Sequence, residues 1–553
     1  MSTGPESSSL IVLDEARADR LLELLRADLV AAAFTVPALE ALWGEDAAAA
    51  LHRGERVPAR RVLDARRREH GASAGLATLA ELFVLGVAVP RAELAAALAG
   101  LGVDGAIELG LVGDADDDGD ADVTGREASV RARLDLRPYA FTDAYGSEEW
   151  WILSDLGELA LGHALGEHHV LGVGGASMTL SGLMLPTPAR RVLDLGTGCG
   201  IQAMHASRFA EHIVATDISE RALEIARLNL VLNGIDGVEL RLGSLFEPVA
   251  GERFDRIVSN PPFVITPRVE GVPEYDYRDG GMVGDALVEA VIREAHEHLE
   301  PGGVAQLLGN WEYRAEGAAD GDAVGLAAGP ADGLDRVGGW AAALEHWVVE
   351  REVQHVTEYA ETWIRDGGTR PGTAEFDRLY DAWLDDFAGR GVERVGFGYV
   401  LLRRADAAAS DAHEGRLARL ERLHGPLGAN DAGLGTHLAE CLAGHDRQAA
   451  LDDTALAAAR FTTAGDVTEE RHYWPGDDDP TAMLLRQGGG FGRAISLDTG
   501  LAALVGASDG ELSIGAIVAA LAQLLEVDET ALAAELLPAV RTLVDDGMLR
   551  FAD

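Results

Sequence analysis

The stretch VLDLGTGCG, residues 192–200, decides the fold that this sequence predicts. Its apolar half indicates a short buried strand, which Gly196, Gly198 and Gly200 interrupt before IQAMHASRFA continues as a helix. Glycines there let the backbone approach a ligand at the carboxyl end of the first strand of a doubly wound sheet. Such a turn alone does not distinguish cofactor binding from mere tight packing of the chain. The G-x-G-x-G spacing differs from the G-x-G-x-x-G dinucleotide fingerprint, which disfavours a nicotinamide-dependent dehydrogenase.

Around this turn, from about residue 148 to residue 405, short apolar strands alternate with helices. The pattern is typical of a doubly wound, mostly parallel, Rossmann-like α/β sheet. Strands are predicted at 191–196, 212–218, 238–242, 254–260, 302–311, 347–354 and 392–404. Two insertions are predicted, one rich in Gly, Ala and Asp near 312–337 and one helical near 356–390. Three aromatic residues of the second insertion are interpreted as packing residues, namely Trp363, Tyr380 and Trp383.

Two further regions flank the predicted sheet, and the 553 residues suffice for three or so domains. Residues 1–147 show a helical segment, then three short helices and two strands around an acidic loop at 114–122, the pattern of a winged helix. An acidic wing tip would repel phosphates, so protein contact or structural support is favoured over groove reading. Residues 406–553 end in two helices and a short strand, like a second winged helix. The predicted division is therefore 1–147, 148–405 and 406–553.

Composition excludes several kinds of chemistry. The net charge is −46 and all 46 basic residues are arginine, so there is no lysine for a Schiff base, a phosphate loop or a kinase site. Cys199 and Cys441 give neither a disulfide framework nor a zinc spacing, and no metal is expected. No apolar run is long enough to span a membrane, and residues 1–10 lack the layout of a signal peptide. A cytoplasmic protein without membrane contact is expected.

The second informative stretch is FDRIVSNPPFVITP, residues 254–267. Pro261 and Pro262 remove two backbone donors, and Pro261 holds Asn260 extended at the end of a predicted strand. The Asn260 side chain and the Pro261 backbone then offer two fixed carbonyl acceptors. Phe263 offers a face on which a planar amide or base can stack. The structural alternative is a proline-terminated strand followed by a packed phenylalanine.

Two carboxylates stand where the predicted sheet would present them to a ligand. Asp194 lies inside the first strand, before the glycines, where it can face a cation. Asp217 ends the next strand, where a carboxylate can accept hydrogen bonds from both hydroxyls of a ribose. The segment HVLGVGGAS, residues 169–177, either lines the same cavity or forms an ordinary loop.

The sequence resembles the class I S-adenosylmethionine-dependent methyltransferases of the NPPY/NPPF type in four motifs, VLDLGTGCG, SLFEPV, VSNPPF and RDGGMVGDALVEAVIREAHEHLEPGG. Within 190–311, about a fifth of the chain, it is similar to release-factor glutamine methyltransferases. The resemblance implies S-adenosylmethionine as cofactor, with Asp194 orienting the methionine ammonium and Asp217 binding the ribose. The implied cofactor-binding set is Asp194, Gly196, Thr197, Gly198, Gly200, Asp217, Ile218, Ser244, Leu245 and Asn260. The implied catalytic set is Asn260, Pro261, Pro262 and Phe263.

Two positions depart from the family's pattern. Ser244 stands where an acidic residue usually meets the adenine amino group, although a hydroxyl can still accept a hydrogen bond. Phe263 replaces the commoner tyrosine, so the ring can stack but offers no hydroxyl. The flanking regions do not match the small helical domain that glutamine methyltransferases carry, which leaves the substrate open but not the chemistry.

Three functions follow from the resemblance. Methyl transfer is an in-line displacement from a sulfonium, to which an enzyme contributes proximity and electrostatics. The first hypothesis is N-methylation of a glutamine amide in a protein of the translation machinery, favoured by the core motifs and the acidic composition. The second is methylation of a base amino group in rRNA, tRNA or DNA, favoured by NPPF and by the seven arginines between Arg53 and Arg68. The alternative interpretation of that run is a solvated helix face whose arginines pair with nearby acidic residues. The third is a non-catalytic winged-helix regulator that senses S-adenosylmethionine.

Overall fold

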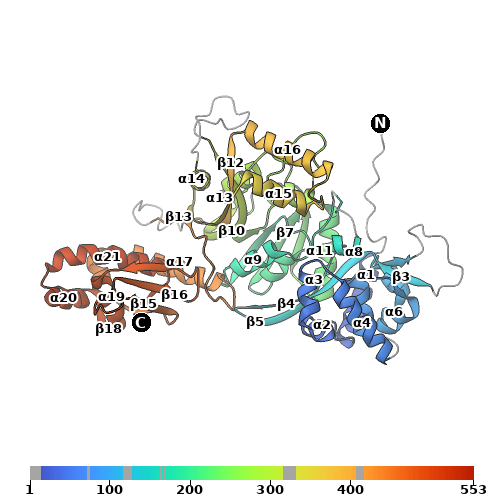
Figure 1. Ribbon diagram of the computed structural model, residues 1–553, viewed down its shortest axis with the longest axis horizontal. Helices are drawn as coiled ribbons and strands as arrows, with labels where there is room; N and C mark the ends of the chain where they lie inside the picture. The colour runs from blue at the N-terminus through green and yellow to red at the C-terminus, as the bar shows by residue number, and fades with distance from the viewer. Residues whose placement is uncertain are drawn as a thin grey trace.

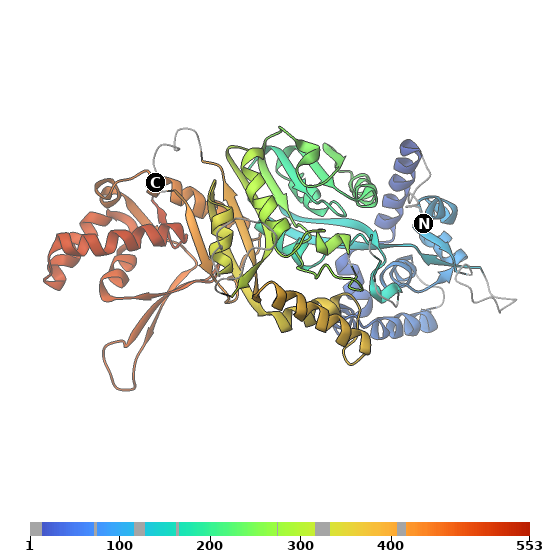
Figure 2. The same ribbon diagram turned by 90° about the horizontal axis from the view of Figure 1, so that it is seen from above.

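The computed structural model describes residues 14–70, 75–115, 128–161, 165–166, 168–273, 275–315, 332–405 and 416–552. Most of the predicted acidic loop at 114–122 and of the predicted insertion near 312–337 lies outside these residues. Figure 1 shows a central sheet with the blue N-terminal region at one side and the red C-terminal region at the other, and Figure 2 shows the same order from above. Among the described residues, no helix combines the length and the apolar character needed to cross a bilayer.

The central sheet has eight strands in the order β13-β11-β12-β10-β9-β6-β7-β8. All its pairs are parallel except those of β12, which runs antiparallel to both neighbours. The strands are β6 Ala189–Leu195, β7 Ala210–Asp217, β8 Val238–Leu242, β9 Phe254–Ser259, β10 Leu299–Arg314, β11 Glu345–His355, β12 Val392–Arg403 and β13 Ala418–Arg422. The doubly wound α/β prediction is confirmed, and all seven predicted strands belong to this sheet.

Helices cover both faces of the sheet. They are α9 Gly175–Leu183, α10 Ile201–Ala206, α11 Glu220–Asn233, α13 Ala286–His298 and α14 Gly333–Trp340. On one face, α13 and α14 pack on alternate strand residues such as Leu193 and Ile257. On the other face, α10 packs on residues of opposite parity such as Val192 and Val258. This alternation is the ordinary strand period of two, and it puts Asp194 and Asn260 on the α10 side.

The second predicted insertion is helical, as expected, and lies against the chain that follows β9. Its helices are α15 Val356–Asp366 and α16 Ala374–Gly389. Trp383 is buried in a cluster that includes Val264 and Ile265, and Trp363 and Tyr380 pack at its margin. The packing interpretation of these three aromatic residues is confirmed. The insertion therefore forms a support beneath the segment after Phe263.

The N-terminal region begins with four helices, α1 Glu15–Ala31, α2 Val36–Trp43, α3 Glu45–His52 and α4 Val57–His70. It continues with α5 Gly75–Leu79 and a π-helical turn Ala80–Val84, β1 Val89–Pro90, α6 Arg91–Ala97, α7 Gly102–Glu108, β2 Val112–Asp114 and β3 Ser129–Ala132. The three strands form a sheet in the order β1-β3-β2. This succession is the one that a winged helix requires, and the assignment to that class stays a prediction.

A long hairpin joins the N-terminal region to the central sheet (Figure 1). It consists of β4 Leu134–Asp143 and β5 Gly146–Asp155, which pair over their whole length. The hairpin was not expected, and the predicted boundary between residues 147 and 148 falls inside β5. The alternation of strands and helices in the sequence begins there, but the edge of β5 is bound by α11 of the central region. Asn229 and Asn233 accept the backbone N–H groups of Leu153 and Trp151, at 2.7 and 2.9 Å.

The C-terminal region holds two small antiparallel sheets, in the orders β18-β14-β19 and β15-β16-β17. Its elements are α17 Gly435–Ala449, α18 Asp453–Ala458, β14 Arg460–Thr463, β15 Val467–His472, β16 Ala482–Gln487, β17 Ala494–Leu497, α19 Thr499–Ala507, β18 Asp509–Ser513, α20 Ile514–Leu525, α21 Glu529–Asp545 and β19 Leu549–Phe551. The predicted boundary between residues 405 and 406 separates β13 from the sheet in which it pairs with β11. A five-residue strand with three charged residues gives little local signal, so the sequence does not indicate this pairing.

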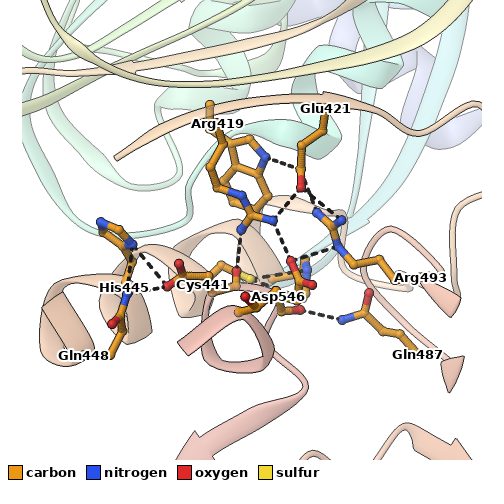
Figure 3. Close-up of polar contacts among 12 residues, drawn as sticks. Arg419, Glu421, Cys441, His445, Gln448, Gln487, Arg493 and Asp546 are labelled. Atoms are coloured by element: carbon orange, nitrogen blue, oxygen red, sulfur yellow. Dashed lines mark hydrogen bonds and ion pairs between the residues drawn. The ribbon is translucent and has the colours of Figure 1, made fainter. Parts of the chain in front are cut away.

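A buried ion network fastens the C-terminal region to the edge of the central sheet (Figure 3). Arg419 and Glu421 come from β13, while Arg493 and Asp546 come from the C-terminal region. Arg419 contacts Asp546 at 2.6 Å, and Arg493 contacts Glu421 at 2.8 Å. Trp347 of β11 adds an indole N–H bond to Glu421 at 2.7 Å. Buried pairs of this kind hold two units in one register, because losing one partner leaves the other charge uncompensated.

Candidate functional site

The glycine turn after β6 is built from backbone hydrogen bonds. Gly196 and Thr197 both donate their N–H groups to the carbonyl of Thr216, each at 2.9 Å, which ties the turn to the end of β7. Gly196, Gly198 and Gly200 have φ of 76°, 55° and 88°, the left-handed region that favours glycine. The turn therefore places bare backbone at the carboxyl edge of the sheet, as the sequence predicts.

Asp194 is fully buried beneath this turn. Its Oδ2 accepts the Thr197 hydroxyl at 2.5 Å and the N–H of Ala203 at 2.9 Å. Its Oδ1 has no hydrogen-bond partner within the part of the chain that the structure describes. Burial raises the pKa of this carboxyl to about 7, although both hydrogen bonds act to lower it. A buried carboxylate oxygen without a donor is costly, so the geometry fits a cationic group brought by a ligand.

Asp217 ends β7 and braces the glycine turn. Its Oδ2 accepts the N–H of Gly198 and its Oδ1 accepts the N–H of Ser219, both at 2.9 Å. The bracing role was not expected. The predicted binding of ribose hydroxyls by Asp217 stays a prediction.

Three other predicted residues lie around Asp217. Ile218 follows it with 67% of its surface exposed. The carbonyl of Asp217 accepts the N–H of Gly243 at 2.9 Å, which brings the turn of Ser244 and Leu245 to the same edge. Leu245 has φ of 46°, a left-handed conformation that costs a non-glycine residue about 1 kcal/mol. Strain of this kind clusters at binding sites.

Asn260 follows β9 directly, and its Oδ1 is a buried atom without a partner in the described ranges. Pro261 is buried and Pro262 is partly buried. The ring of Phe263 lies 5.6 Å from the ring of Phe397 on β12, centroid to centroid. The NPPF segment thus places one amide oxygen and one aromatic ring at the edge where β9 ends.

The strand register brings the predicted residues together. Asp194 pairs with Val258 on β9, and Asn260 lies two residues beyond Val258 on the same face. Asp194 and Asn260 therefore present their unpartnered oxygens from neighbouring strands toward one side. Thr197, the three glycines, Asp217, Ile218, Ser244 and Leu245 surround the same edge, so the structure gathers the whole predicted set at the carboxyl ends of β6 to β9.

Two kinds of residue around the site were missed by the sequence analysis. Asn229 donates its side-chain N–H to the carbonyl of Cys199 in the glycine turn at 2.8 Å, while holding β5 with its other contacts. Two asparagines four residues apart, and therefore on one face of the helix, were the available signal. Gln202 donates to the carbonyl of Ser177 at 2.8 Å, which places the segment 169–177 beside the turn.

In the described ranges no three His, Cys, Asp or Glu residues are grouped as metal ligands. Cys199 and Cys441 are both buried free thiols, and burial raises the pKa of Cys199 to about 11. A thiol held protonated in this way is a poor ligand and a poor nucleophile.

Three family models match separate parts of the chain. Residues 174–319 match the family described as "Methyltransferase small domain". Residues 31–123 match "Domain of unknown function (DUF7059)", and residues 445–551 match "Domain of unknown function (DUF7782)". The match to the family whose description names an activity therefore covers the glycine turn, Asp217 and the NPPF segment.

Curated relatives match the same central part. The chain is 41% identical over 128 residues to the ribosomal protein uL3 glutamine methyltransferase of Bradyrhizobium diazoefficiens, which is 21% of this chain and 40% of the relative. It is 39% identical over 136 residues to a release factor glutamine methyltransferase of Xylella fastidiosa, 23% and 49% of the two chains. It is 29% identical over 180 residues to the ribosomal RNA small subunit methyltransferase C of Salmonella newport, 32% and 46% of the two chains. The chain thus spans less than half the length of each of these relatives.

Proposed function

Since residues 174–319 form a methyltransferase small domain of the class I, S-adenosylmethionine-dependent type, we propose that this protein methylates a planar nitrogen of a macromolecule, namely a glutamine side-chain amide in a protein. One observation carries the proposal. Asp194 and Asn260 present two buried oxygens that lack partners among the described residues, on one face and from adjacent strands. One oxygen suits a cation and the other suits the N–H of an amide.

The residues at the glycine turn fit the cofactor. Asp194 Oδ1 would accept the ammonium of its methionine part, and Asp217 would accept hydrogen bonds from its ribose hydroxyls. The exposed Ile218 offers an apolar surface to the adenine ring. When bound, S-adenosylmethionine supplies a methyl group on a positively charged sulfur.

Asn260 and Phe263 would hold the acceptor nitrogen. The lone pair of an amide nitrogen is delocalised, so the nitrogen is a poor nucleophile until it is positioned and polarised. Asn260 Oδ1 would accept one N–H of the amide, which places the nitrogen and draws positive charge onto its hydrogen. Phe263 offers a ring on which the planar group can stack.

Two facts support a protein glutamine as the substrate. The two relatives with the higher identity carry names that state glutamine methylation. The net charge of −46 repels polyanions over most of the surface and favours a protein or peptide partner. The proposal is tested by transfer of labelled methyl from S-adenosylmethionine into extract of cells that lack this protein, using wild type and Asn260→Ala. Label that protease releases and nuclease does not supports the proposal, and nuclease-sensitive label contradicts it.

A second candidate, methylation of a base amino group, is favoured by the 180-residue match to an rRNA methyltransferase and by α4. Arg60 and Arg61 of that helix are exposed. The predicted contact with nucleic acid does not extend to every arginine of the helix. Arg67 instead contacts Glu81 at 2.5 Å and Glu93 at 3.1 Å. Arg67 is thus a structural residue.

For this second candidate we expect Arg60→Ala plus Arg61→Ala to flatten the salt dependence of RNA binding. Each lost phosphate contact reduces the slope of log K against log salt by about one. The slope is measured by fluorescence anisotropy with a labelled rRNA fragment. Arg471→Ala plus Arg486→Ala is the matched control, because both residues are exposed and the charge change is equal. Equal slopes for the two double variants would remove the argument for a nucleic-acid substrate.

We expect Asp217→Ala to weaken S-adenosylmethionine binding by about 10- to 100-fold. The variant loses the charged acceptor for the ribose and frees the N–H of Gly198, and hydrogen bonds to charged groups contribute about 1.5–3 kcal/mol each. Calorimetric titration measures the change, with Asp236→Ala as control because Asp236 is exposed on the turn after α11. Unchanged affinity with lost transfer would instead place Asp217 on the substrate side.

A further inference from the structure

Resting on the function proposed above, we propose that Asn310 recognises the substrate. Its buried amide donates an N–H to the carbonyl oxygen of the same carboxamide whose nitrogen Asn260 holds. The two asparagines would then read a primary carboxamide from both ends.

The register of the sheet places Asn310 beside Asn260. Leu307 on β10 pairs with Ser259 on β9, so Leu308 lies level with Asn260, and Asn310 is two residues further along the same face. Asn310 pairs with Phe397 on β12, and the Phe397 ring packs on Phe263. Asn310 is buried, with 2% of its surface exposed.

Tyr359 determines which of the two terminal positions of the Asn310 amide holds the oxygen and which holds the nitrogen. The amide atom next to the phenol lies 2.6 Å from its oxygen, and Ile265 donates its backbone N–H to that oxygen at 3.0 Å. If the amide atom were nitrogen, the phenol oxygen would receive two donors and its own hydrogen would have no acceptor among the described residues. If the amide atom is oxygen, the phenol donates to it, and 2.6 Å is an ordinary O–H···O distance but short for N–H···O.

The oxygen and nitrogen of an amide differ only by a half-turn of the group, so these contacts assign them. Tyr359 takes the oxygen, and the –NH2 group of Asn310 occupies the other position. No donor in the described part of the chain lies within hydrogen-bonding distance of that position, so an oxygen there would be unpaired, whereas an –NH2 group there meets no like donor. An –NH2 group in that position can donate to a substrate carbonyl.

The pair of asparagines is complementary to a carboxamide. Asn260 supplies an acceptor for the amide N–H, and Asn310 supplies a donor for the adjacent carbonyl. A carboxylate in place of the carboxamide would meet Asn260 with a like acceptor. A guanine edge, which offers two adjacent donors, would meet Asn310 with a like donor. A site rejects a wrong substrate strongly when binding that substrate would leave a buried polar group unpaired.

Tyr359 is a positioning residue in this arrangement. It lies on α15, is buried, and joins Asn310 to Ile265 in the segment that follows Phe263. The helical insertion between β11 and β12 thereby orients an amide at the substrate site as well as supporting the loop.

The test uses the full chain and the probe N-acetylglutamine methylamide, with N-acetylglutamate methylamide, adenosine and guanosine as comparison ligands. Probe binding is measured by ligand-observed NMR in the presence of S-adenosylhomocysteine, and kcat and KM are measured for methyl transfer to the probe. We expect Asn310→Leu and Asn310→Asp each to weaken probe binding and raise KM by about 100-fold, with cofactor affinity and the thermal midpoint near wild type. We expect Tyr359→Phe to raise KM by a smaller factor, about 5- to 10-fold, because the amide loses its orientation and not its donor.

Four outcomes separate the possibilities. Wild-type binding by Asn310→Asp overturns the donor assignment, because aspartate offers oxygens only. Wild-type behaviour of all three variants overturns any role of Asn310. A wild-type protein that binds cofactor but prefers adenosine or guanosine to the glutamine probe overturns both the carboxamide assignment and the proposed glutamine substrate, and leaves a methyltransferase that acts on a base. A wild-type protein that binds no S-adenosylmethionine overturns the proposed function itself.

Discussion

Asn260→Ala is expected to reduce methyl transfer by about 1,000-fold while changing the dissociation constant of S-adenosylmethionine by less than about threefold. The buried Oδ1 of Asn260 is the acceptor that would hold the reacting nitrogen, and removal of one fixed polar group at a reacting centre costs about 10²–10³ in rate. Cofactor affinity is retained because the partners of the glycine turn, Asp194 and Asp217, are untouched. Initial rates with labelled cofactor and calorimetric titration measure the two quantities.

Ser259→Ala is the matched control for this substitution. Ser259 is the preceding residue, points to the opposite face of the sheet, and donates its hydroxyl to the carbonyl of Leu195 at 2.8 Å. Loss of that bond is expected to cost about 1 kcal/mol of stability and to leave transfer within about tenfold of wild type. If Asn260→Ala weakened cofactor binding and spared the rate at saturating cofactor, the two ends of the site would be assigned in reverse.

Asp194→Asn is expected to weaken S-adenosylmethionine binding by about 100-fold or more, because a neutral amide cannot replace a buried carboxylate that meets an ammonium. Asp255→Asn is the matched control. Asp255 lies at the opposite, amino-terminal edge of the sheet, where it accepts the backbone N–H groups of Arg190 and Arg191 at 3.0 and 2.8 Å. Equal losses in both variants would mean that binding depends on the sheet and not on the Asp194 charge.

The pH dependence gives an independent check on Asp194. Its pKa is about 7 without ligand, and a cationic ligand needs the ionised form. Affinity is therefore expected to fall about tenfold for each pH unit below 7 and to level off above it, whereas Asp194→Asn is expected to show no such slope. The folded pKa lies above the unfolded value, so the stability linked to Asp194 is present below pH 4 and lost as pH rises through 7. At pH 8 without cofactor, Asp194→Asn is expected to melt above wild type.

The sheet and the cofactor edge could be predicted because their signals are local. A strand followed by spaced glycines, a carboxylate at a strand end and a proline-stopped asparagine each occupy a few consecutive residues. The roles of Asn310 and Tyr359 could not be predicted, because they depend on the register of β9, β10 and β12 and on a helix inserted between β11 and β12. The hairpin β4–β5 was missed for a similar reason.

The bracing of the glycine turn by Asp217 shows the same limit. The sequence identified the residue and a use for it, but the contact with the N–H of Gly198 depends on how closely β7 approaches the turn. The sequence also does not indicate pairings between strands that are distant along the chain, such as that of β13 with β11.

The two side chains Asn229 and Asn233 have a practical consequence for dissecting this protein. Asn229 bonds to the backbone of β5 and to the carbonyl of Cys199 in the glycine turn, so one amide is shared between the hairpin and the cofactor edge. A catalytic fragment that started at residue 148 would discard β4 and leave β5, the strand that these amides hold, without its hairpin partner. Limited proteolysis and expression trials should therefore look for a domain boundary before Leu134, where β4 begins. A fragment designed in this way keeps the hairpin together with the central sheet.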